Sequence, residues 1–355
     1  MSLEVREWAD QPSWDAFVGS QTTGHYNQGW GWGDIAGPLG GRVFRRALTD
    51  GNKIRAVMSV AANSIKGSSR VGFHISRGPT VDEPTAEIMQ LLMDDLSRMA
   101  RKQNAVFAKI EPYLPAYDKT WPALLRTAGF SPLFPPSQPR SVWMIDLQPD
   151  LEEIQAGMKP KWRYNIRLAA KRGVEIVRGT EADIDDYYRL YQVTSRRDDF
   201  YIHDREIYRQ MFRNFWNLGQ FDLVMAKLGG EPIAAVTLIT LGRTIWYAFG
   251  ASSNEHREVM APHALQWEAI KIGKERGALL YDLRGVPDVP GPDQEMSGVY
   301  RFKQGFGGYH ETFLEQYARG YQAPLYGLWK AYWQGRYAVQ SIQRRRQGLP
   351  HRQWA

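Results

Sequence analysis

The chain is 355 residues long, and its 43% hydrophobic and 13% aromatic content is enough for two domains with hydrophobic cores. The absence of cysteine excludes disulfides, cysteine-ligated metals and an acyl-enzyme thioester. A formal net charge of +7 favours polyanionic partners such as tRNA, nucleotide diphosphates or anionic lipid. No stretch approaches the roughly 18 apolar residues of a membrane span, and the N-terminal residues lack an apolar signal core, so we expect a cytoplasmic location.

Two hairpins of the same length are predicted, one in each half of the chain. Residues 43–60 form two apolar runs on either side of a tight Asp-Gly-Asn turn. Residues 222–239 repeat the length, the turn position and the Ala-Val pair of the second run. A further strand follows each hairpin, at 71–78 and 245–250. The matched order indicates an internal duplication.

The duplication continues through a helix and further strands. Apolar residues at helical spacing predict helices over 86–103 and 262–276. Each helix is followed by a short apolar strand, at 105–111 and 278–284, then by a Gly-Phe pair and a final strand. The offset between the copies stays nearly constant, which indicates two copies of one α/β unit with a mixed sheet.

This order of elements resembles the acetyltransferase fold of the GNAT superfamily, present twice. We therefore predict an α/β protein with GNAT-like domains over 1–148 and 149–316, and a C-terminal helical segment over 317–355 that packs on the first domain and ends in a basic tail. GNAT enzymes bind the acetyl-CoA pyrophosphate on a Gly-rich turn before the central helix. Residues 79–84 and 251–257 lack such a turn, so a CoA thioester is not the expected acyl donor.

Two Gly-rich motifs stand out near the ends of the duplicated region. The first, over 24–33, contains Gln28 and Trp32, and its alternative interpretation is a loop and helix start packed by tryptophans. The second, over 297–308, contains Phe302 and Lys303 before a Gly-Phe-Gly-Gly run. A Gly-rich turn before the last strand would explain the glycines of this motif but not the lysine.

A third motif is a basic helix over 158–173, in which Arg163, Arg167 and Lys171 follow one another at i, i+4 and i+8. Gly173 is the expected C-cap. The stripe has no acidic neighbour, and like charges at this spacing repel one another. A phosphate partner is therefore favoured over the alternative of a solvated helix face.

Together the three motifs resemble the Fem family of peptidoglycan bridge-forming aminoacyltransferases, over roughly residues 14 to 315. The resemblance implies a non-ribosomal peptidyltransferase that moves Gly, Ala or Ser from aminoacyl-tRNA to a stem-peptide amine of UDP-MurNAc-pentapeptide or lipid II. No heptad run interrupts the second domain, so the compact form without a coiled-coil arm is expected. Two alternatives stay open: an acyl-CoA-dependent GNAT N-acyltransferase and a non-catalytic RNA-binding scaffold.

The resemblance also assigns roles to individual residues. It implies that Phe302 and Lys303 lie at the catalytic centre, where a lysine ammonium can stabilise the oxyanion of aminolysis or hold the 3′ end of the tRNA. Glu111, where the family tends to carry Asp, is the candidate that accepts the amine proton, with a hydrogen-bonded strand-end Glu as the alternative. The candidate substrate-binding residues are Arg205, Tyr208, Tyr247, Gln28, Trp32 and Arg42. The candidate tRNA or phosphate-binding residues are Lys159, Lys161, Arg163, Arg167 and Lys171.

Some of these roles have further alternatives. Tyr247 lies in an aromatic strand, where a core position is the alternative. The family members that bind the UDP-linked precursor carry a lysine soon after the N-terminal tryptophans, and this lysine is missing here. Either Arg42 or Arg45 replaces it, or the acceptor is the lipid-linked form. No metal or cofactor motif occurs, and a monomer is expected. The aromatic half of the C-terminal helix is expected to dock, while contact of the basic run with the inner membrane surface stays open.

Overall fold

The computed structural model describes residues 3–65, 67–288 and 296–346. The chain forms two compact units whose sequences interleave. The first unit comprises the described residues among 1–141, 285–297 and 311–355, and the second comprises 142–284 and 298–310. Among the described residues, no helix combines the length and the apolar character needed to cross a bilayer.

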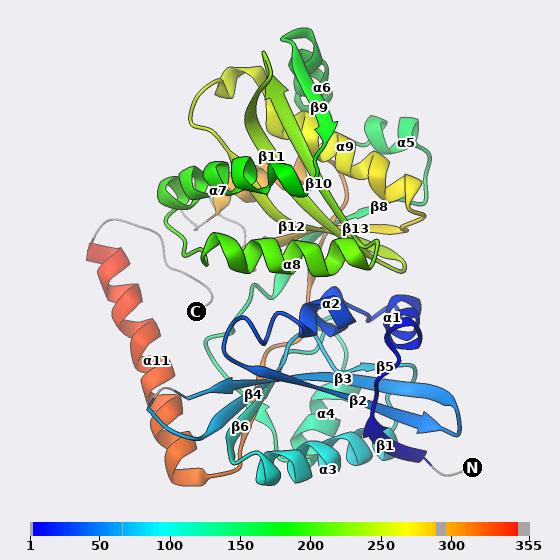
Figure 1. The fold of residues 1–355 in the computed structure, drawn as a ribbon, viewed down its shortest axis with the longest axis vertical. Helices are drawn as coiled ribbons and strands as arrows, with labels where there is room; N and C mark the ends of the chain where they lie inside the picture. Colours follow the sequence, from blue (N-terminus) through cyan, green and yellow to red (C-terminus); the bar gives the residue numbers. More distant parts are fainter. Residues whose placement is uncertain (1–2, 66, 289–295, 347–355) are drawn as a thin grey trace. The chain divides into compact units, whose positions relative to one another are not determined.

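The first unit is built on a mixed sheet with helices on both faces. Its strand order is β1-β2-β3-β4-β6-β15-β7, with β5 paired to β3, and only β4 and β6 run parallel. The strands are β1 Leu3–Glu7, β2 Arg42–Asp50, β3 Lys53–Ser64, β4 Val71–Ile75, β5 Thr80–Val81, β6 Ala105–Ile110, β7 Ser131–Pro132 and β15 Tyr317–Gly320. The helices are α1 Gln11–Ser20, α2 Trp30–Gly33, α3 Ala86–Lys102, α4 Thr120–Thr127 and α11 Ala323–Arg346. Figure 1 shows α3 and α4 on one face of this sheet and α1 and α2 on the other.

The central helix α3 forms where the apolar spacing predicts it. The Thr85 side chain caps its first turn by accepting a hydrogen bond from the amide of Ile88. Ile88, Leu92 and Leu96 recur at i, i+4 and i+8 and are fully buried in the core of this unit. This stripe packs α3 against β6, which pairs with β4, so the helix supports the strands that carry His74 and lead to Glu111.

The second unit repeats this plan. Its strand order is β14-β8-β13-β12-β11-β10-β9, and β12 and β13 run parallel with α9 between them. The strands are β8 Ser141–Asp146, β9 Val174–Arg178, β10 Phe221–Leu228, β11 Glu231–Leu241, β12 Thr244–Ser252, β13 Leu280–Val286 and β14 Tyr309–Thr312. The helices are α5 Leu151–Ala156, α6 Pro160–Lys171, α7 Ile184–Asp198, α8 Arg205–Asn217, α9 Ala261–Glu275 and α10 Ser297–Gln304. In both units an antiparallel hairpin leads to a strand, a crossover helix and a parallel strand, so the predicted duplicated α/β fold is confirmed.

The last strands of the two repeats depart from the expected domain ranges. β8 follows the first repeat in sequence but belongs to the second sheet, and β15 follows the second repeat but lies between β6 and β7 in the first sheet. The ranges 1–148, 149–316 and 317–355 therefore do not coincide with the two units. The physical reason is that strand pairing is made over long sequence separations, which a local pattern does not record.

The Phe-Lys motif also folds differently from the Gly-rich turn considered above. Phe302 and Lys303 lie in helix α10, which ends at Gln304. Gly305 follows because a Cβ atom there would overlap the ring of Trp162. Gly307 and Gly308 then adopt left-handed backbone, with φ of 81° and 83°. The glycines thus end the helix, and the helix holds the lysine.

Candidate functional site

Lys303 is a buried amine in the second unit. It is 4% exposed, and its Nζ donates a hydrogen bond to the carbonyl oxygen of Arg284, 3.3 Å away. Burial lowers the pKa of Lys303 to about 7; Asp282 opposes this shift and Arg284 adds to it. Near neutral pH the side chain therefore exchanges between ammonium and amine, which suits a group that meets developing charge.

Phe302 stands beside Lys303 at the centre of an aromatic cluster. Its ring makes edge contacts with His263 and Phe306, each at a centroid distance of 5.2 Å. Its carbonyl oxygen accepts a hydrogen bond of 2.9 Å from the indole of Trp162 in α6. Burial, with a smaller effect of Lys161, lowers the pKa of His263 to about 4, so this imidazole is neutral at pH 7. Trp162 and His263 were not among the predicted residues, although Trp162 lies inside the basic motif.

A cavity of about 710 Å³ opens next to Phe302. It is formed by the ends of β11 and β12, the loop before α9 and the start of α10, and its lining includes Arg257, His263 and Phe302. His256 and Met260 in this loop adopt left-handed backbone, with φ of 55° and 59°. Such backbone costs energy in non-glycine residues and concentrates at functional sites. The loop turns the chain so that the N-terminus of α9, which favours anions, borders the cavity.

Glu111 is the centre of a polar network in the first unit. Its Oε2 accepts hydrogen bonds from Ser76 Oγ at 3.2 Å and Gln138 Nε2 at 3.2 Å, and lies 3.0 Å from His74 Nε2. Burial acts to raise the pKa of Glu111, but His74, Lys109 and Arg77 together lower it to about 2. The carboxylate is therefore ionised at neutral pH and is a weak proton acceptor.

The N-terminal motif supplies the wall of a small cavity near this network. The cavity measures about 180 Å³ and is lined by Asn27, Trp32, His74, Ser76 and Gln138 among others. Asn27 Nδ2 donates to Ser76 Oγ at 2.9 Å, while its buried Oδ1 has no hydrogen-bond partner among the described residues. The predicted residue Trp32 thus faces a cavity, together with polar side chains that the sequence did not single out.

Two other residues predicted for this unit make structural contacts. Gln28 is fully buried, donates from Nε2 to the carbonyl oxygen of Ser76 at 2.7 Å and accepts from the amide of Ser59 at 2.9 Å. Gln28 therefore ties β3 to the end of β4. Arg42 is exposed, donates to Gln103 at 2.9 Å and does not line the small cavity.

The predicted acceptor residues of the second unit differ in exposure. Arg205 is half exposed at the start of α8 and lies 3.3 Å from Asp185. Tyr208 is buried in an aromatic cluster with Tyr191 and Phe249, at centroid distances of 5.4 and 5.7 Å. Burial, followed by Asp198, raises the pKa of Tyr247 to about 12. Tyr208 is thus buried, Tyr247 is half-buried, and Arg205 is the accessible member of the set.

The basic helix α6 divides into structural and accessible cations. Arg163 donates to the carbonyl oxygens of Ala156 and Met158, at 2.8 and 2.6 Å, and so satisfies the end of α5. Lys159 donates to Gln304 at 2.6 Å. Lys159 is exposed all the same, and the other exposed members are Lys161, Arg167 and Lys171, which form no salt bridge within the described part of the chain.

Two mixed sheets of one plan, each with a crossover helix between its two parallel strands, define an acyltransferase fold of the tandem GNAT type. A solved tandem GNAT protein from the clavulanic acid biosynthesis pathway superposes with a TM-score of 0.55 at 12% identity, over 90% of this chain and 98% of its own. A solved FemX structure superposes with a TM-score of 0.85 at 21% identity, over 93% of this chain and all of its own.

The sequence pattern of the FemAB family matches residues 10–120, 126–231 and 218–331, so the chain belongs to the FemAB family, and it is an aminoacyltransferase. One relative, the lipid II:glycine glycyltransferase of Staphylococcus epidermidis, is 23% identical over 384 residues. That alignment covers 88% of this chain and 92% of the relative.

Proposed function

We propose that this protein transfers an aminoacyl group of the Gly, Ala or Ser type from aminoacyl-tRNA to a stem-peptide amine of a peptidoglycan precursor, with lipid II as the acceptor. The observation that carries the proposal is the buried Lys303, next in the chain to Phe302, which lines a cavity bordered by Arg257 and the N-terminus of α9. The relative named as a lipid II:glycine glycyltransferase supports this choice of acceptor over the UDP-linked precursor.

The cavity of the second unit suits the 3′ end of a charged tRNA. Arg257 and the N-terminus of α9 border it and favour phosphate. The aromatic ring of Phe302 offers a surface on which a base or ribose packs. The exposed cations of α6, Lys161, Arg167 and Lys171, supply a separate surface for the tRNA backbone.

The transfer is an aminolysis of an ester. The neutral acceptor amine attacks the aminoacyl carbonyl carbon, a C–N bond forms, and negative charge develops on the carbonyl oxygen. The intermediate collapses with cleavage of the C–O bond to the terminal ribose, and the proton lost by the amine ends on the released ribose hydroxyl. The Lys303 ammonium stabilises the oxyanion, and its pKa of about 7 lets it exchange a proton during the step.

The carboxylate network of the first unit suits recognition of the acceptor. Glu111 is ionised and lies close to the small cavity that Asn27 and Trp32 line. An ionised carboxylate attracts the ammonium groups of a peptide, and the unpartnered Asn27 oxygen accepts a further hydrogen bond.

The test is mass spectrometry of lipid II and of UDP-MurNAc-pentapeptide after incubation with the protein and a pool of charged tRNAs. We expect a mass gain of one amino acid on lipid II that RNase abolishes. Lys303→Met should remove the gain, whereas Tyr201→Ser, at an exposed tyrosine, should leave it intact. Acetyl transfer from acetyl-CoA without any RNase-sensitive gain would instead establish the acyl-CoA-dependent alternative.

A further inference from the structure

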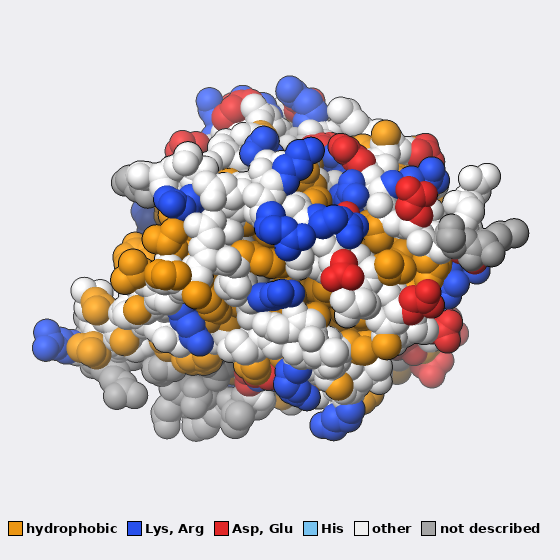
Figure 2. All heavy atoms as spheres, turned by 90° about the horizontal axis from the view of Figure 1, so that it is seen from below, with side chains coloured by type: hydrophobic (Ala, Val, Ile, Leu, Met, Phe, Trp, Pro, Cys, Tyr) orange, Lys and Arg blue, Asp and Glu red, His pale blue; other side chains and the backbone are white. Residues whose placement is uncertain are grey.

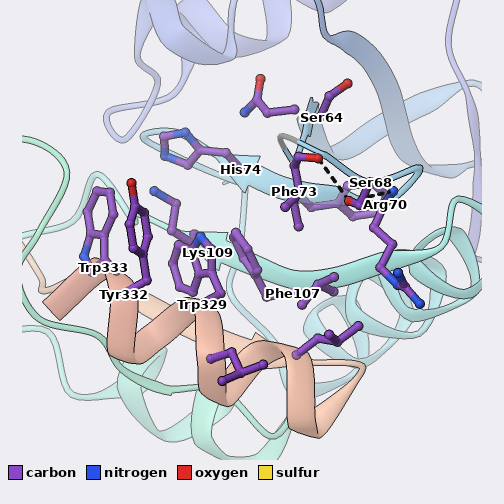
Figure 3. Close-up of a pocket in the computed structure, with 16 residues that line it drawn as sticks. Ser64, Ser68, Arg70, Phe73, His74, Phe107, Lys109, Trp329, Tyr332 and Trp333 are labelled. Carbon is purple, nitrogen blue, oxygen red and sulfur yellow. Dashed lines mark hydrogen bonds between the residues drawn. The ribbon is translucent and has the colours of Figure 1, made fainter. Parts of the chain in front are cut away.

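Helix α11 has two different apolar faces. Its inner face carries Trp329 and Trp333, whose rings stack at a centroid distance of 5.7 Å. Trp329 stacks on Phe107 of β6 at 3.8 Å, and Trp333 donates from its indole to the carbonyl oxygen of Pro135 at 3.1 Å. Figure 3 shows these side chains of α11 beside Phe107 and Lys109 of the first sheet. This face fixes the helix to its unit.

The surface on which α11 packs is formed by strands β4 and β6 of the first sheet. A Cβ atom at Gly72 would lie 2.5 Å from the Phe107 ring, so glycine lets this ring lie against β4 while Trp329 covers it. Lys109 Nζ lies 4.9 Å from the centroid of the Trp333 ring, a cation–π contact. A cavity of about 710 Å³ remains between α11 and strands β4 and β6. The helix is therefore held at several points along its inner face.

A stripe of large, exposed hydrophobic side chains on α11, the outer stripe, is defined by Leu328, Tyr332, Val339 and Ile342; its members Leu328 and Tyr332 also line the cavity between α11 and the sheet. They are 69%, 63%, 54% and 52% exposed, respectively, within the described structure. Their spacing of i, i+4, i+11 and i+14 places them within an arc of about 80° on a helix of 3.6 residues per turn. Isolated exposed apolar residues are ordinary, but four in line on one helix mark an interaction surface.

The charges of α11 are of one sign. The helix contains no Asp or Glu, and its charged residues are Lys330, Arg336 and the three arginines at 344–346. The Arg336 guanidinium lies 5.9 Å from the centroid of the Tyr332 ring, so a cation sits directly beside the stripe. Figure 2 shows the molecule from below, where Lys and Arg side chains lie among hydrophobic ones and Asp and Glu side chains are also present. An apolar stripe with a cation at its edge, on a helix that carries no acidic residue, is the pattern of helices that lie on anionic membranes.

We propose that the outer stripe of α11 binds the surface of an anionic lipid bilayer. Charge complementarity selects this partner, because a second copy of the chain would bring cations against cations across a symmetric contact. Leu328 and Tyr332 belong to the stripe and also line the cavity beneath α11, so binding brings the mouth of that cavity to the lipid surface. The proposal does not depend on the transfer reaction.

The experiment is flotation of the purified full-length protein with vesicles of phosphatidylcholine alone or with about 30% phosphatidylglycerol, free of precursor and tRNA. We expect binding to the anionic vesicles that weakens with salt, and at least about tenfold weaker binding to neutral ones. Leu328→Gln with Ile342→Gln should lower binding about tenfold or more. Leu39→Gln with Tyr117→Ser removes exposed apolar surface elsewhere and should bind as wild type.

A second pair of variants tests the charges. Arg336→Gln with Arg346→Gln should weaken binding to anionic vesicles about tenfold, whereas Lys53→Gln with Lys119→Gln carries the same change in net charge and should bind almost normally. Equal losses in the two pairs would overturn the proposal, because net charge alone would then explain the binding. A wild-type dimer in light scattering that the stripe variant converts to monomer would also overturn it, in favour of a second copy.

Discussion

Burial of Lys303 opposes folding, because the charged amine loses its hydration when it is buried. Its pKa is about 7 in the folded protein and about 10.4 in an unfolded chain. Between these values the unfolded chain binds more protons, so the free energy of unfolding rises with pH in this interval. Such a cost is retained where a residue serves function rather than stability.

Replacing Lys303 should therefore separate activity from stability. For Lys303→Met we expect transfer to fall about 100-fold or more, and the free energy of unfolding at pH 7 to increase by at least about 1 kcal/mol. The gain in stability should shrink as the pH approaches 10. Single-turnover transfer assays and denaturant unfolding across this pH range measure both effects. A variant that is active and no more stable would show that Lys303 is an ordinary buried residue.

Glu111 has the opposite linkage. Its folded pKa of about 2 is below the ordinary value of 4.5, so its contribution to stability is present above pH 4.5 and is lost as the pH falls toward 2. For Glu111→Gln we expect a free energy of unfolding lower by about 2 kcal/mol at pH 7, and a difference that closes as the pH falls from 4.5 to 2. Chemical denaturation at several pH values measures this difference.

The same substitution tests acceptor recognition. If the Glu111 carboxylate attracts the acceptor, Glu111→Gln should raise the acceptor KM more than it lowers kcat. Asp95→Asn is a matched control, because Asp95 is also a buried carboxylate of the first unit and forms a salt bridge of 2.7 Å with Arg46. That variant should lose stability and keep its KM. A raised KM in both variants would mean that the effect follows instability alone.

At the scale of elements, α6 combines two kinds of cation on one helix. Its exposed members are Lys161, Arg167 and Lys171, whereas Arg163 satisfies carbonyl groups at the end of α5. Replacing the three exposed cations by Gln should weaken tRNA binding and lower the slope of log K against log salt by about 2 to 3. Filter binding at several salt concentrations measures the slope.

Two controls define this prediction. Lys53, Lys102 and Lys119 are exposed on the other unit, and their replacement by Gln should leave the salt slope unchanged. Arg163→Gln should instead cost about 1 kcal/mol of stability with little effect on the slope. A loss of affinity that is equal for the two triple variants would assign tRNA binding to net charge rather than to α6.

The elements were predictable where the sequence is locally periodic. The apolar stripe of α3 and the matched hairpins predicted both copies of the fold, and the confirmed elements differ from the predicted ranges by a few residues. Helix α10 was not predicted, because the glycines at 305, 307 and 308 that follow it are also typical of a turn. The partners of Glu111 were missed for another reason. His74, Ser76 and Gln138 are 27 to 37 residues away from Glu111 in the sequence, and no local sequence pattern predicts contacts at that separation.

At the scale of the whole chain, the interleaving of the two units follows from where β8 and β15 pair. β15 lies between β6 and β7, with Tyr317 opposite Ile110 and opposite Pro132. Without β15, β6 becomes an edge strand with unpaired N–H and C=O groups, and β7 loses its partner in this sheet. The first unit is thus incomplete until residues near the end of the chain have been made.

This topology predicts which pieces of the chain fold. A polypeptide of residues 1–148, which ends at the boundary that the sequence suggested, should aggregate, because the face and edge normally covered by β15 and α11 are exposed. A polypeptide of 1–141 joined by a flexible linker to 311–346 restores both elements and should be soluble, with a single cooperative unfolding transition. Thermal unfolding followed by circular dichroism compares the two. Cooperative folding of 1–148 alone would contradict this prediction, because it would show that the first sheet is stable without β15 and α11.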